Sequence, residues 1–256
     1  MYFHAILQYM DNLRSLQVPK YYQYKWYVDV AISILTLPVL GTVILLFMFL
    51  TWLTSKGPVI YTQIRCSKDG KPFKMYKIRS MYVDAETRSG PVRPGDYDPR
   101  VTPIGGIMRR FHIDELTQIV NVWRGEMTVI GPRPERPEAA EIFKKEIPGY
   151  EYRMLVLPGL TGYAQLNRPP DWDVKGIRKK LILDLEYIER ASFWFDMRIL
   201  LGTALKLFRM KNTYFGGLPL KMCGAYRDPQ ESPWADIIGC EEFDDSTISR
   251  PADGYK

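Results

Sequence analysis

The sequence is poor in the residues on which disulfide frameworks and histidine catalysis depend. Its 256 residues include three cysteines and two histidines. Cys66, Cys223 and Cys240 are widely spaced and odd in number, so they support neither a disulfide framework nor a C-x-x-C metal site, and a reducing compartment is the simplest fit. With only His4 and His112, a multi-histidine zinc site is excluded, and histidine-based nucleophilic machinery would have to use His112. Any catalysis must therefore depend mainly on carboxylates, lysine, arginine or a hard metal ion.

Charged residues are absent from Val30 to Leu53, a run long enough to be a membrane segment. A cleaved signal peptide fits poorly, because a polar, aromatic-rich stretch precedes the run and no small-residue cleavage pattern follows it. We therefore expect a permanent membrane element. Pro38 lies within the run and should kink a helix there, because proline removes one helical hydrogen bond.

The flanks of this run leave two topologies open. A straight helix over the run would cross a bilayer core of ~30 Å. Lys20 and Lys25 flank one end, however, and Lys56 flanks the other. Because basic flanks stay in the cytoplasm, a helix that enters the membrane and turns back at Pro38 would satisfy the charge rule at both ends. Spacing alone does not choose between the two.

Positive charge is concentrated just after the apolar run. The net charge of the chain is +6, but between Thr54 and Ile113 twelve Lys or Arg residues stand against five acids, an excess of seven. Such an excess marks the cytoplasmic side of a membrane and would attract anionic lipid or a phosphorylated substrate. The simpler alternative is that it only sets the topology.

The rest of the chain has the pattern of a small α+β domain. Two β-rich runs, 59–65 and 73–78, flank a Lys-Asp-Gly-Lys turn at 68–71 and predict a β-hairpin. A helix is expected from near Gly106 to Gly125, because its apolar residues recur with a period of 3.6.

The later segments are expected to alternate between loops and helices. Residues 84–103 and 157–173 should form loops. Helices are expected after Pro134 or Pro137, from about 175 to 190 with Asp173 as a cap, and from about 193 to 210. The last of these is amphipathic and could lie on the membrane or pack in the core. Residues 211–256 carry eight acidic and five basic residues with little periodicity, and should form a loosely ordered tail.

Asp114 and Glu115 are the strongest candidates for chemistry. Adjacent residues on a helix point ~100° apart, so the two should not both face the core, but they can flank one reacting centre. One carboxylate would attack while the other holds a divalent cation, and hard oxygen ligands select Mg²⁺, which usually arrives with a phosphate. That is the chemistry of phosphoryl transfer through a phosphoryl-aspartate. The simpler alternative is a surface acid pair opposite Arg109 and Arg110.

Two arginines could complete a phosphate site. Arg79 in "KIRSM" and Arg133 in "GPRP" lie at the ends of predicted elements, where a guanidinium group can clamp phosphate oxygens. Arginines at loop ends are more often simply solvated, so neither residue is decisive alone.

Taken together, the motifs resemble a known family. In order along the chain, they are Lys25 and Asp29 at the membrane entry, Pro38 in the apolar run, "GKPFKMYKIRSM", "IDELTQIVNVWRGEM", "IGPRPERP", "PGLTGYAQLN" and "LDLEYIERASFWFDMRIL". This ordered set, from Lys25 to Phe208, resembles the monotopic phosphoglycosyl transferases of bacteria, which begin lipid-linked glycan assembly, in their minimal form.

The resemblance implies a fold and a location. It implies an α+β protein anchored by an N-terminal re-entrant helix-break-helix, with Pro38 at the break and a compact, mostly helical domain carrying a small β-hairpin and amphipathic interfacial helices. The domains would be an interfacial segment at 1–27, a re-entrant hairpin at 28–54, a catalytic domain at 55–210 facing the cytoplasm, and the tail at 211–256. The location would be the bacterial cytoplasmic membrane.

The resemblance also implies a reaction. Asp114 would attack the sugar-linked phosphate of a UDP-sugar and release UMP, and a polyprenyl phosphate would then take the sugar phosphate from the enzyme. Glu115, with Asp114, would hold Mg²⁺ or orient the phosphates. Arg79, Arg133 and Asp184 match the family's other polar positions, as substrate or phosphate contacts.

The expected partners are therefore a UDP-sugar, a polyprenyl phosphate and membrane lipid, without nucleic acid. A homodimer stays open. Three positions depart from the family pattern, namely Trp26 after the entry lysine, Leu37 before the proline, and Leu157 before "PGLTG". The rival hypothesis is a membrane-tethered module that binds anionic lipid or nucleic acid without catalysis, which would leave Asp114 and Glu115 unexplained.

Overall fold

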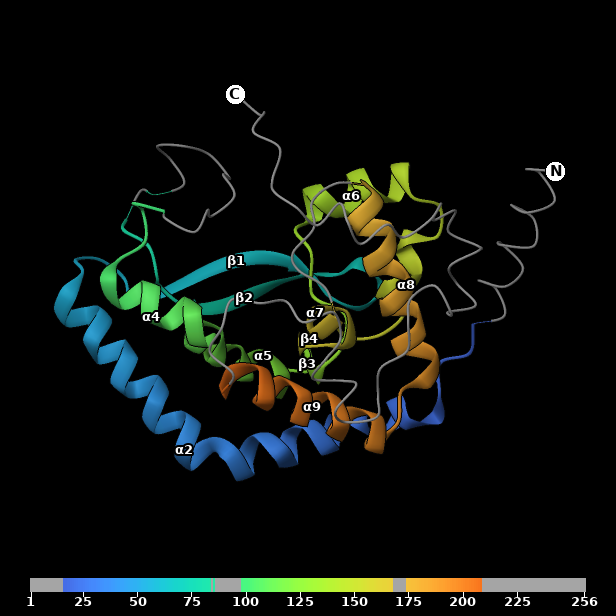
Figure 1. Cartoon of the computed structure of the whole chain (residues 1–256), viewed down its shortest axis with the longest axis horizontal. Helices are drawn as coiled ribbons and strands as arrows, with labels where there is room; N and C mark the ends of the chain where they lie inside the picture. Colours follow the sequence, from blue (N-terminus) through green and yellow to red (C-terminus); the bar gives the residue numbers. More distant parts are fainter. Residues whose placement is uncertain (1–15, 84, 86–97, 168–173, 209–256) are drawn as a thin grey trace.

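The structure is a computed structural model, and it describes residues 16–83, 85, 98–167 and 174–208. In these residues the fold is a mostly helical α+β arrangement with two two-stranded sheets and one long apolar helix near the N-terminus (Figure 1). The fold class is confirmed at this level. The predicted tail at 211–256, most of the 84–103 loop and the Asp173 cap lie outside the described residues.

Helix α2 (Lys25–Thr54) contains the whole apolar run and follows a short 3-10 helix, η1 (Lys20–Gln23). By length and composition alone it could cross a membrane, with a mean hydropathy of 2.5. Pro38 lies inside one continuous helix, and Figure 1 shows α2 changing direction part-way along. The helix is therefore continuous through the proline at which a break was expected.

The predicted β-hairpin is confirmed. Strands β1 (Ile60–Cys66) and β2 (Pro72–Ile78) pair antiparallel, with Ile60 opposite Ile78 and Cys66 opposite Pro72. The short helix η2 (Lys68–Gly70) joins them. Asp69 and Gly70 make the reversal with positive φ angles of 57° and 74°, a conformation that aspartate and glycine tolerate.

The single helix expected from Gly106 to Gly125 is wrong. The segment forms three elements, α4 (Pro103–Phe111), the 3-10 helix η3 (Ile113–Gln118) and α5 (Ile119–Trp123). Thr102 caps α4 by accepting a hydrogen bond from Gly105 N at 2.9 Å, and His112 ends it in the left-handed conformation with φ 54°. The spacing of hydrophobic residues does not reveal a single left-handed residue. The helical period therefore continued across His112, where the structure breaks the helix.

The glycine pair in α4 makes a matched test of this packing. A Cβ on Gly105 would lie 1.9 Å from the Ser80 carbonyl oxygen, whereas a Cβ on Gly106 would meet nothing within 4 Å. We expect Gly105→Ala to destabilise the protein by about 2 kcal/mol or more and Gly106→Ala to stabilise it by roughly 0.5–1 kcal/mol. Urea unfolding of both variants checks this, and equal midpoints would contradict the close approach of α4 to Ser80.

A second, parallel pair of strands lies at the centre of the domain. Strands β3 (Thr128–Ile130) and β4 (Gly159–Thr161) pair with Thr128 opposite Gly159 and Ile130 opposite Thr161. The other elements are α6 (Pro137–Glu146), η4 (Tyr150–Met154), α7 (Tyr163–Asn167), α8 (Val174–Arg190) and α9 (Phe193–Phe208). The start of α6 at a proline and the last two helices were predicted. The uniform loop expected over 157–173 is wrong, because β4 and α7 lie within it.

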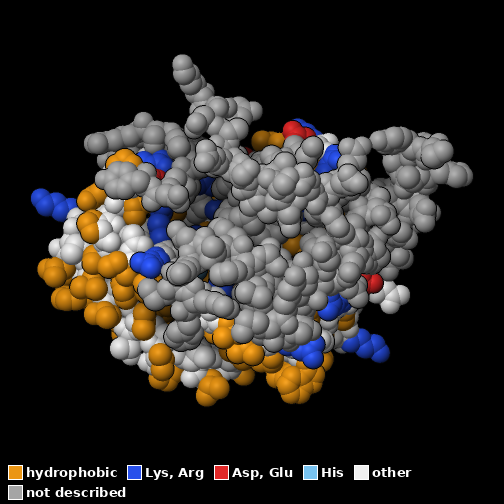
Figure 2. Space-filling view, viewed as in Figure 1, with side chains coloured by type: hydrophobic (Ala, Val, Ile, Leu, Met, Phe, Trp, Pro, Cys, Tyr) orange, Lys and Arg blue, Asp and Glu red, His pale blue; other side chains and the backbone are white. Residues whose placement is uncertain are grey.

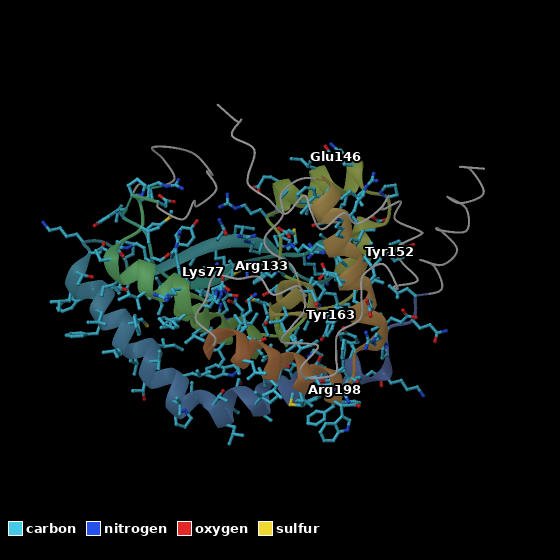
Figure 3. The ribbon with its side chains drawn as sticks, in the orientation of Figure 1. Lys77, Arg133, Glu146, Tyr152, Tyr163 and Arg198 are labelled. Carbon is cyan, nitrogen blue, oxygen red and sulfur yellow. The ribbon has the colours of Figure 1, made fainter. Side chains whose placement is uncertain are left out.

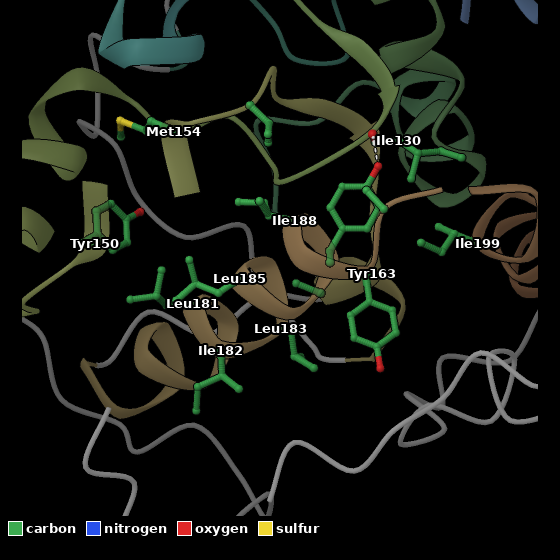
Figure 4. Close-up of a cluster of buried hydrophobic side chains, with 14 of the residues drawn as sticks. Ile130, Tyr150, Met154, Tyr163, Leu181, Ile182, Leu183, Leu185, Ile188 and Ile199 are labelled. Atoms are coloured by element: carbon green, nitrogen blue, oxygen red, sulfur yellow. Dashed lines mark hydrogen bonds between the residues drawn. The ribbon is translucent and has the colours of Figure 1, made fainter. Parts of the chain in front are cut away.

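The main core surrounds helix α8. Figure 4 shows its apolar side chains meeting those of η4, β3, α7 and α9, and Leu181, Ile182 and Leu185 are fully buried. The Tyr187 hydroxyl donates to the Ile130 carbonyl at 2.7 Å, which ties α8 to the strand that precedes the "GPRP" loop. Burial of this size supplies most of the driving force for folding.

Both ends of α2 contact the globular domain. Near its start, Lys25 pairs with Asp196 of α9, and Asp29 accepts a hydrogen bond from Thr128 of β3. At its other end, Ser55 accepts a hydrogen bond from Arg79 Nη2, 2.7 Å from its carbonyl oxygen.

The middle of α2 is instead exposed and apolar. Leu35, Val39 and Leu45 are 82%, 69% and 68% exposed. Figure 2 shows hydrophobic side chains along the left and lower edges of the molecule, where α2 runs in Figure 1. Trp194 and Leu201 of α9 are also exposed, at 73% and 54%, while Phe195 and Ile199 of the same helix are buried. Helix α9 therefore packs one face in the core and leaves an apolar face uncovered.

Candidate active site

Asp114 and Glu115 lie on η3 and are both buried, at 7% and 8% exposure. The expectation that they could not both face the interior is wrong, because η3 packs against β2, α2 and α4 and is therefore covered on more than one side. Side chains after the pair hold this turn against strand β2. Thr117 Oγ1 donates to the Tyr76 carbonyl at 3.1 Å, and Asn121 Nδ2 donates to the Lys74 carbonyl at 2.7 Å.

Glu115 is held by two cations. Lys77 Nζ lies 2.7 Å from Oε1, and Arg133 donates from Nη2 to Oε1 at 2.8 Å and from Nη1 to Oε2 at 3.3 Å. Figure 3 shows Lys77 and Arg133 close together at the centre of the molecule, at the hairpin and the "GPRP" loop respectively. Burial would raise the pKa of Glu115, but the charges of Arg133 and Lys77 outweigh it and hold that pKa well below its usual range. Glu115 is therefore ionised at neutral pH.

Asp114 differs from Glu115 in its hydrogen bonding and in the direction of its pKa shift. Its carboxylate accepts no hydrogen bond from the residues that the structure describes. Burial and the charge of Glu115 raise its pKa, while Lys77, His112 and Arg109 partly offset this. The two adjacent carboxylates thus differ in their surroundings, since Glu115 pairs with two cations and Asp114 accepts no hydrogen bond from the described residues.

The loop that carries Arg133 follows β3 and lies against β4. Gly131 N donates to the Thr161 carbonyl at 2.9 Å, and a Cβ on Gly159 would lie 2.0 Å from Gly131 N. Only glycines permit this approach of the two loops. The motifs "IGPRP" and "PGLTG" are therefore one structural unit beside the Asp-Glu pair.

Two predicted site residues lie elsewhere. Arg79 is buried and donates to Ser55 at the end of α2, and its Nε and Nη1 atoms have no hydrogen-bond partner among the described residues. Asp184 is 2% exposed and pairs with Arg153 at 2.7 Å. Within the described residues, neither shares a hydrogen bond or ion pair with Asp114 or Glu115. Pro38 lies in the exposed middle of α2.

Lys77 is the site residue that sequence reasoning missed. It lies two positions before Arg79 in "YKIRSM", and alternation along a strand would have placed both side chains on one face of the hairpin. Its contact with Glu115 depends on how η3 packs on β2, for which the sequence has no local signal.

The pair could contribute to a metal site but does not form a complete one. The described residues contain no group of three or more His, Cys, Asp or Glu side chains able to hold a metal ion. Mg²⁺, however, is often bound through one or two carboxylates together with substrate phosphates. The oxygens of Asp114, which accept no hydrogen bond from the part of the chain that the structure describes, fit that donor set with Glu115 beside them.

Comparison with known proteins agrees with this geometry. Residues 20–210 match the bacterial sugar transferase family. The chain belongs to the bacterial sugar transferase family. The match includes α2, the hairpin, the Asp-Glu turn and both glycine-rich loops, so the family assignment covers every element of the candidate site.

Several bacterial proteins are similar to the chain over 55% to 73% of its length. It is 39% identical over 188 residues to UDP-glucose:undecaprenyl-phosphate glucose-1-phosphate transferase of Escherichia coli, covering 73% of this chain and 40% of that protein. It is 47% identical over 140 residues to a putative undecaprenyl-phosphate N-acetylgalactosaminyl 1-phosphate transferase of Bacillus subtilis, covering 55% and 78%. It is 38% identical over 183 residues to exopolysaccharide production protein PSS of Rhizobium leguminosarum, covering 69% and 91%. The matched region is thus less than half of the first relative and most of the other two.

Proposed function

We propose that this protein transfers a sugar 1-phosphate from a UDP-sugar to undecaprenyl phosphate, as the first membrane step of exopolysaccharide or glycan assembly. The observation that carries the proposal is the Asp-Glu turn of a bacterial sugar transferase. In it, Asp114 is buried without a hydrogen-bond partner among the described residues, beside a Glu115 held by Lys77 and Arg133. The relatives' names describe the same reaction with different sugars.

The reaction would run in two displacements at one phosphorus atom. In the first, an Asp114 oxygen attacks the sugar-linked phosphorus of the donor, the bond to the bridging oxygen breaks, and UMP leaves with that oxygen. The sugar phosphate is then an acyl phosphate on Asp114. In the second, an oxygen of undecaprenyl phosphate attacks the same phosphorus, and Asp114 leaves as a carboxylate. Donor and acceptor therefore need not be bound together.

The surrounding charges suit this chemistry. Lys77 and Arg133 would stabilise the negative charge that spreads over the phosphoryl oxygens in the transition state. Their bonds to Glu115 place them before the substrate arrives, so little reorganisation is needed. Mg²⁺ bound by Asp114, Glu115 and the donor phosphates would neutralise further phosphate charge.

The nucleotide product is the direct test. Purified protein in lipid nanodiscs, mixed with undecaprenyl phosphate, Mg²⁺ and either UDP-glucose or UDP-N-acetylgalactosamine, should release UMP with at least one donor. Direct transfer of the sugar alone would release UDP. A non-catalytic lipid-binding module would release neither from a broad panel of UDP-sugars, and either of these results would reject the proposal.

We also propose that α2 is re-entrant, so that its two ends lie on the same side of the membrane. The contacts of Lys25 with Asp196 and of Ser55 with Arg79 support this, because one globular domain holds both ends. A straight helix of this length would be ~45 Å long and would carry one end across the bilayer. The apolar middle around Leu35 would then dip into the membrane and the domain would stay in the cytoplasm.

Labelling of single cysteines tests this topology. Lys20 and Lys56 are exposed and flank α2. In a background with the three native cysteines changed to serine, Lys20→Cys and Lys56→Cys should both resist a membrane-impermeant maleimide in intact cells and both react after lysis. Leu35→Cys should react poorly in either case, because it would lie in lipid. Labelling of either flank in intact cells, with the other protected, would establish a spanning helix.

A further inference from the structure

We propose that Arg153, held in place by Asp184, is a positioning residue that fixes the backbone of Arg133 and so aims its guanidinium at Glu115 and the substrate phosphates. Asp184 would then act through Arg153 and would not touch the substrate. This inference rests on the proposed function, because its consequence is read in the transfer reaction.

The loop that carries Arg133 is held along its whole length. Pro132 and Pro134 flank the arginine, so their rings restrict the backbone and supply no N–H donors. Each of four successive carbonyl groups accepts a hydrogen bond from a different part of the fold. The donors are Gly159 N to Pro132 at 2.8 Å, Arg153 Nη2 to Arg133 at 3.0 Å, Arg65 Nη1 to Pro134 at 3.1 Å and Cys66 N to Glu135 at 2.9 Å.

Arg153 donates the hydrogen bond to the carbonyl of Arg133, the residue that pairs with Glu115. It is 4% exposed, and besides the Arg133 carbonyl it contacts Asp184, from Nε at 2.9 Å and from Nη2 at 2.7 Å. Nη1 donates to the Tyr150 hydroxyl at 2.8 Å and lies 3.4 Å from Glu135 Oε1. A rigid fork with this many partners has one orientation, which is what a positioning group requires.

The charges around Arg153 are balanced. Lys180 also pairs with Glu135, so two cations and two carboxylates form one cluster. Burial would raise the pKa of Glu135, but the charges of Lys180 and Arg153 lower it to about 2. The cluster therefore carries no excess charge that a substrate phosphate must neutralise, unlike the cations at Glu115.

The alternative is that Asp184 binds the phosphates or their metal ion. Its position opposes this, because it is 2% exposed on the central helix of the core, and one of its oxygens already accepts a hydrogen bond from Arg153 Nε and lies 2.7 Å from Nη2. Without the Asp184 carboxylate the Arg153 fork would lose its partner at Nε, and the position of its bond to the Arg133 carbonyl would shift. Misplacement of a catalytic group by about 1 Å costs on the order of 100-fold in rate.

The test compares Asp184→Asn with a matched control on the same helix. Glu186 is 1% exposed and pairs with Arg190 one turn further along α8, so Glu186→Gln removes a buried carboxylate of the same kind. We expect Asp184→Asn to lower kcat about 10- to 100-fold, with the donor KM and the Mg²⁺ concentration for half-maximal rate changed less than about 2-fold. Glu186→Gln should leave kcat unchanged. A clear rise in the Mg²⁺ requirement of Asp184→Asn would mark Asp184 as a metal or phosphate ligand and overturn the proposal.

A double-mutant cycle tests whether Asp184 acts through Arg133. If it does, Asp184→Asn combined with Arg133→Lys should have the same kcat as Arg133→Lys alone, within about 2-fold. Multiplying effects would overturn the proposal. If Asp184→Asn does not fold, Arg153→Lys keeps a cation beside Asp184 but loses the fork, and should show the same pattern. Wild-type protein that releases no UMP would instead refute the proposed function.

Discussion

Asp114→Asn should abolish UMP release, by on the order of 10⁴-fold or more, because the amide cannot form the phosphoryl bond. Wild-type enzyme quenched after mixing with its donor should gain the mass of the sugar phosphate, and the variant should show no added mass. Asp69→Asn is the matched control. Asp69 lies on the hairpin turn with φ 57°, which asparagine also adopts, so this change should leave turnover intact.

The Asp114→Asn variant should stay folded. Burial and the neighbouring Glu115 raise the pKa of Asp114, so its ionised form opposes folding at neutral pH. A neutral asparagine removes that opposition, and the free energy of unfolding should be unchanged or slightly higher. An Asp114→Asn enzyme that keeps most of its turnover, or that forms the adduct, would show that another group is the nucleophile.

Glu115→Gln should lower both activity and stability. Its removal leaves Lys77 and Arg133 without their shared carboxylate, and loss of one such electrostatic group costs about 10²–10³-fold in kcat. We expect the free energy of unfolding to fall by about 2–3 kcal/mol, less than for a fully buried pair, because the Arg133 side chain is 39% exposed. Steady-state kinetics and urea unfolding at neutral pH measure the two effects. A variant as stable as wild type would show that the ion pairs contribute nothing net.

The pH dependence of stability tests whether Glu115 is held ionised in the folded protein. Because the pKa of Glu115 is lower in the folded than in the unfolded protein, its contribution to stability is fully present above about pH 4.5. It is lost as the pH falls through the lowered folded value, since both states then bind the proton. Wild type should therefore lose more stability than Glu115→Gln between about pH 5 and pH 3. Parallel losses over that range would assign the pH sensitivity to other carboxylates.

The secondary structure could be predicted from the sequence where a residue restricts its own backbone or that of its neighbours. The turn at Asp69 and Gly70, the apolar alternation beside it and the proline that opens α6 each limit the backbone directly. The left-handed turn at His112 left no such mark, because histidine is also common in right-handed helices and the turn depends on how η3 packs against the rest of the fold. The prediction of one long helix failed there for that reason.

The sequence by itself determined the long apolar helix, the hairpin, the motif order and the Asp-Glu pair, because each depends on residues that are near one another in the chain. Only the tertiary structure decided that both carboxylates are buried, that Lys77 and Arg133 hold Glu115, and that Asp184 pairs with Arg153. Those contacts join residues 18 to 38 positions apart, and packing alone chooses among the charged partners that a chain this rich in lysine and arginine offers.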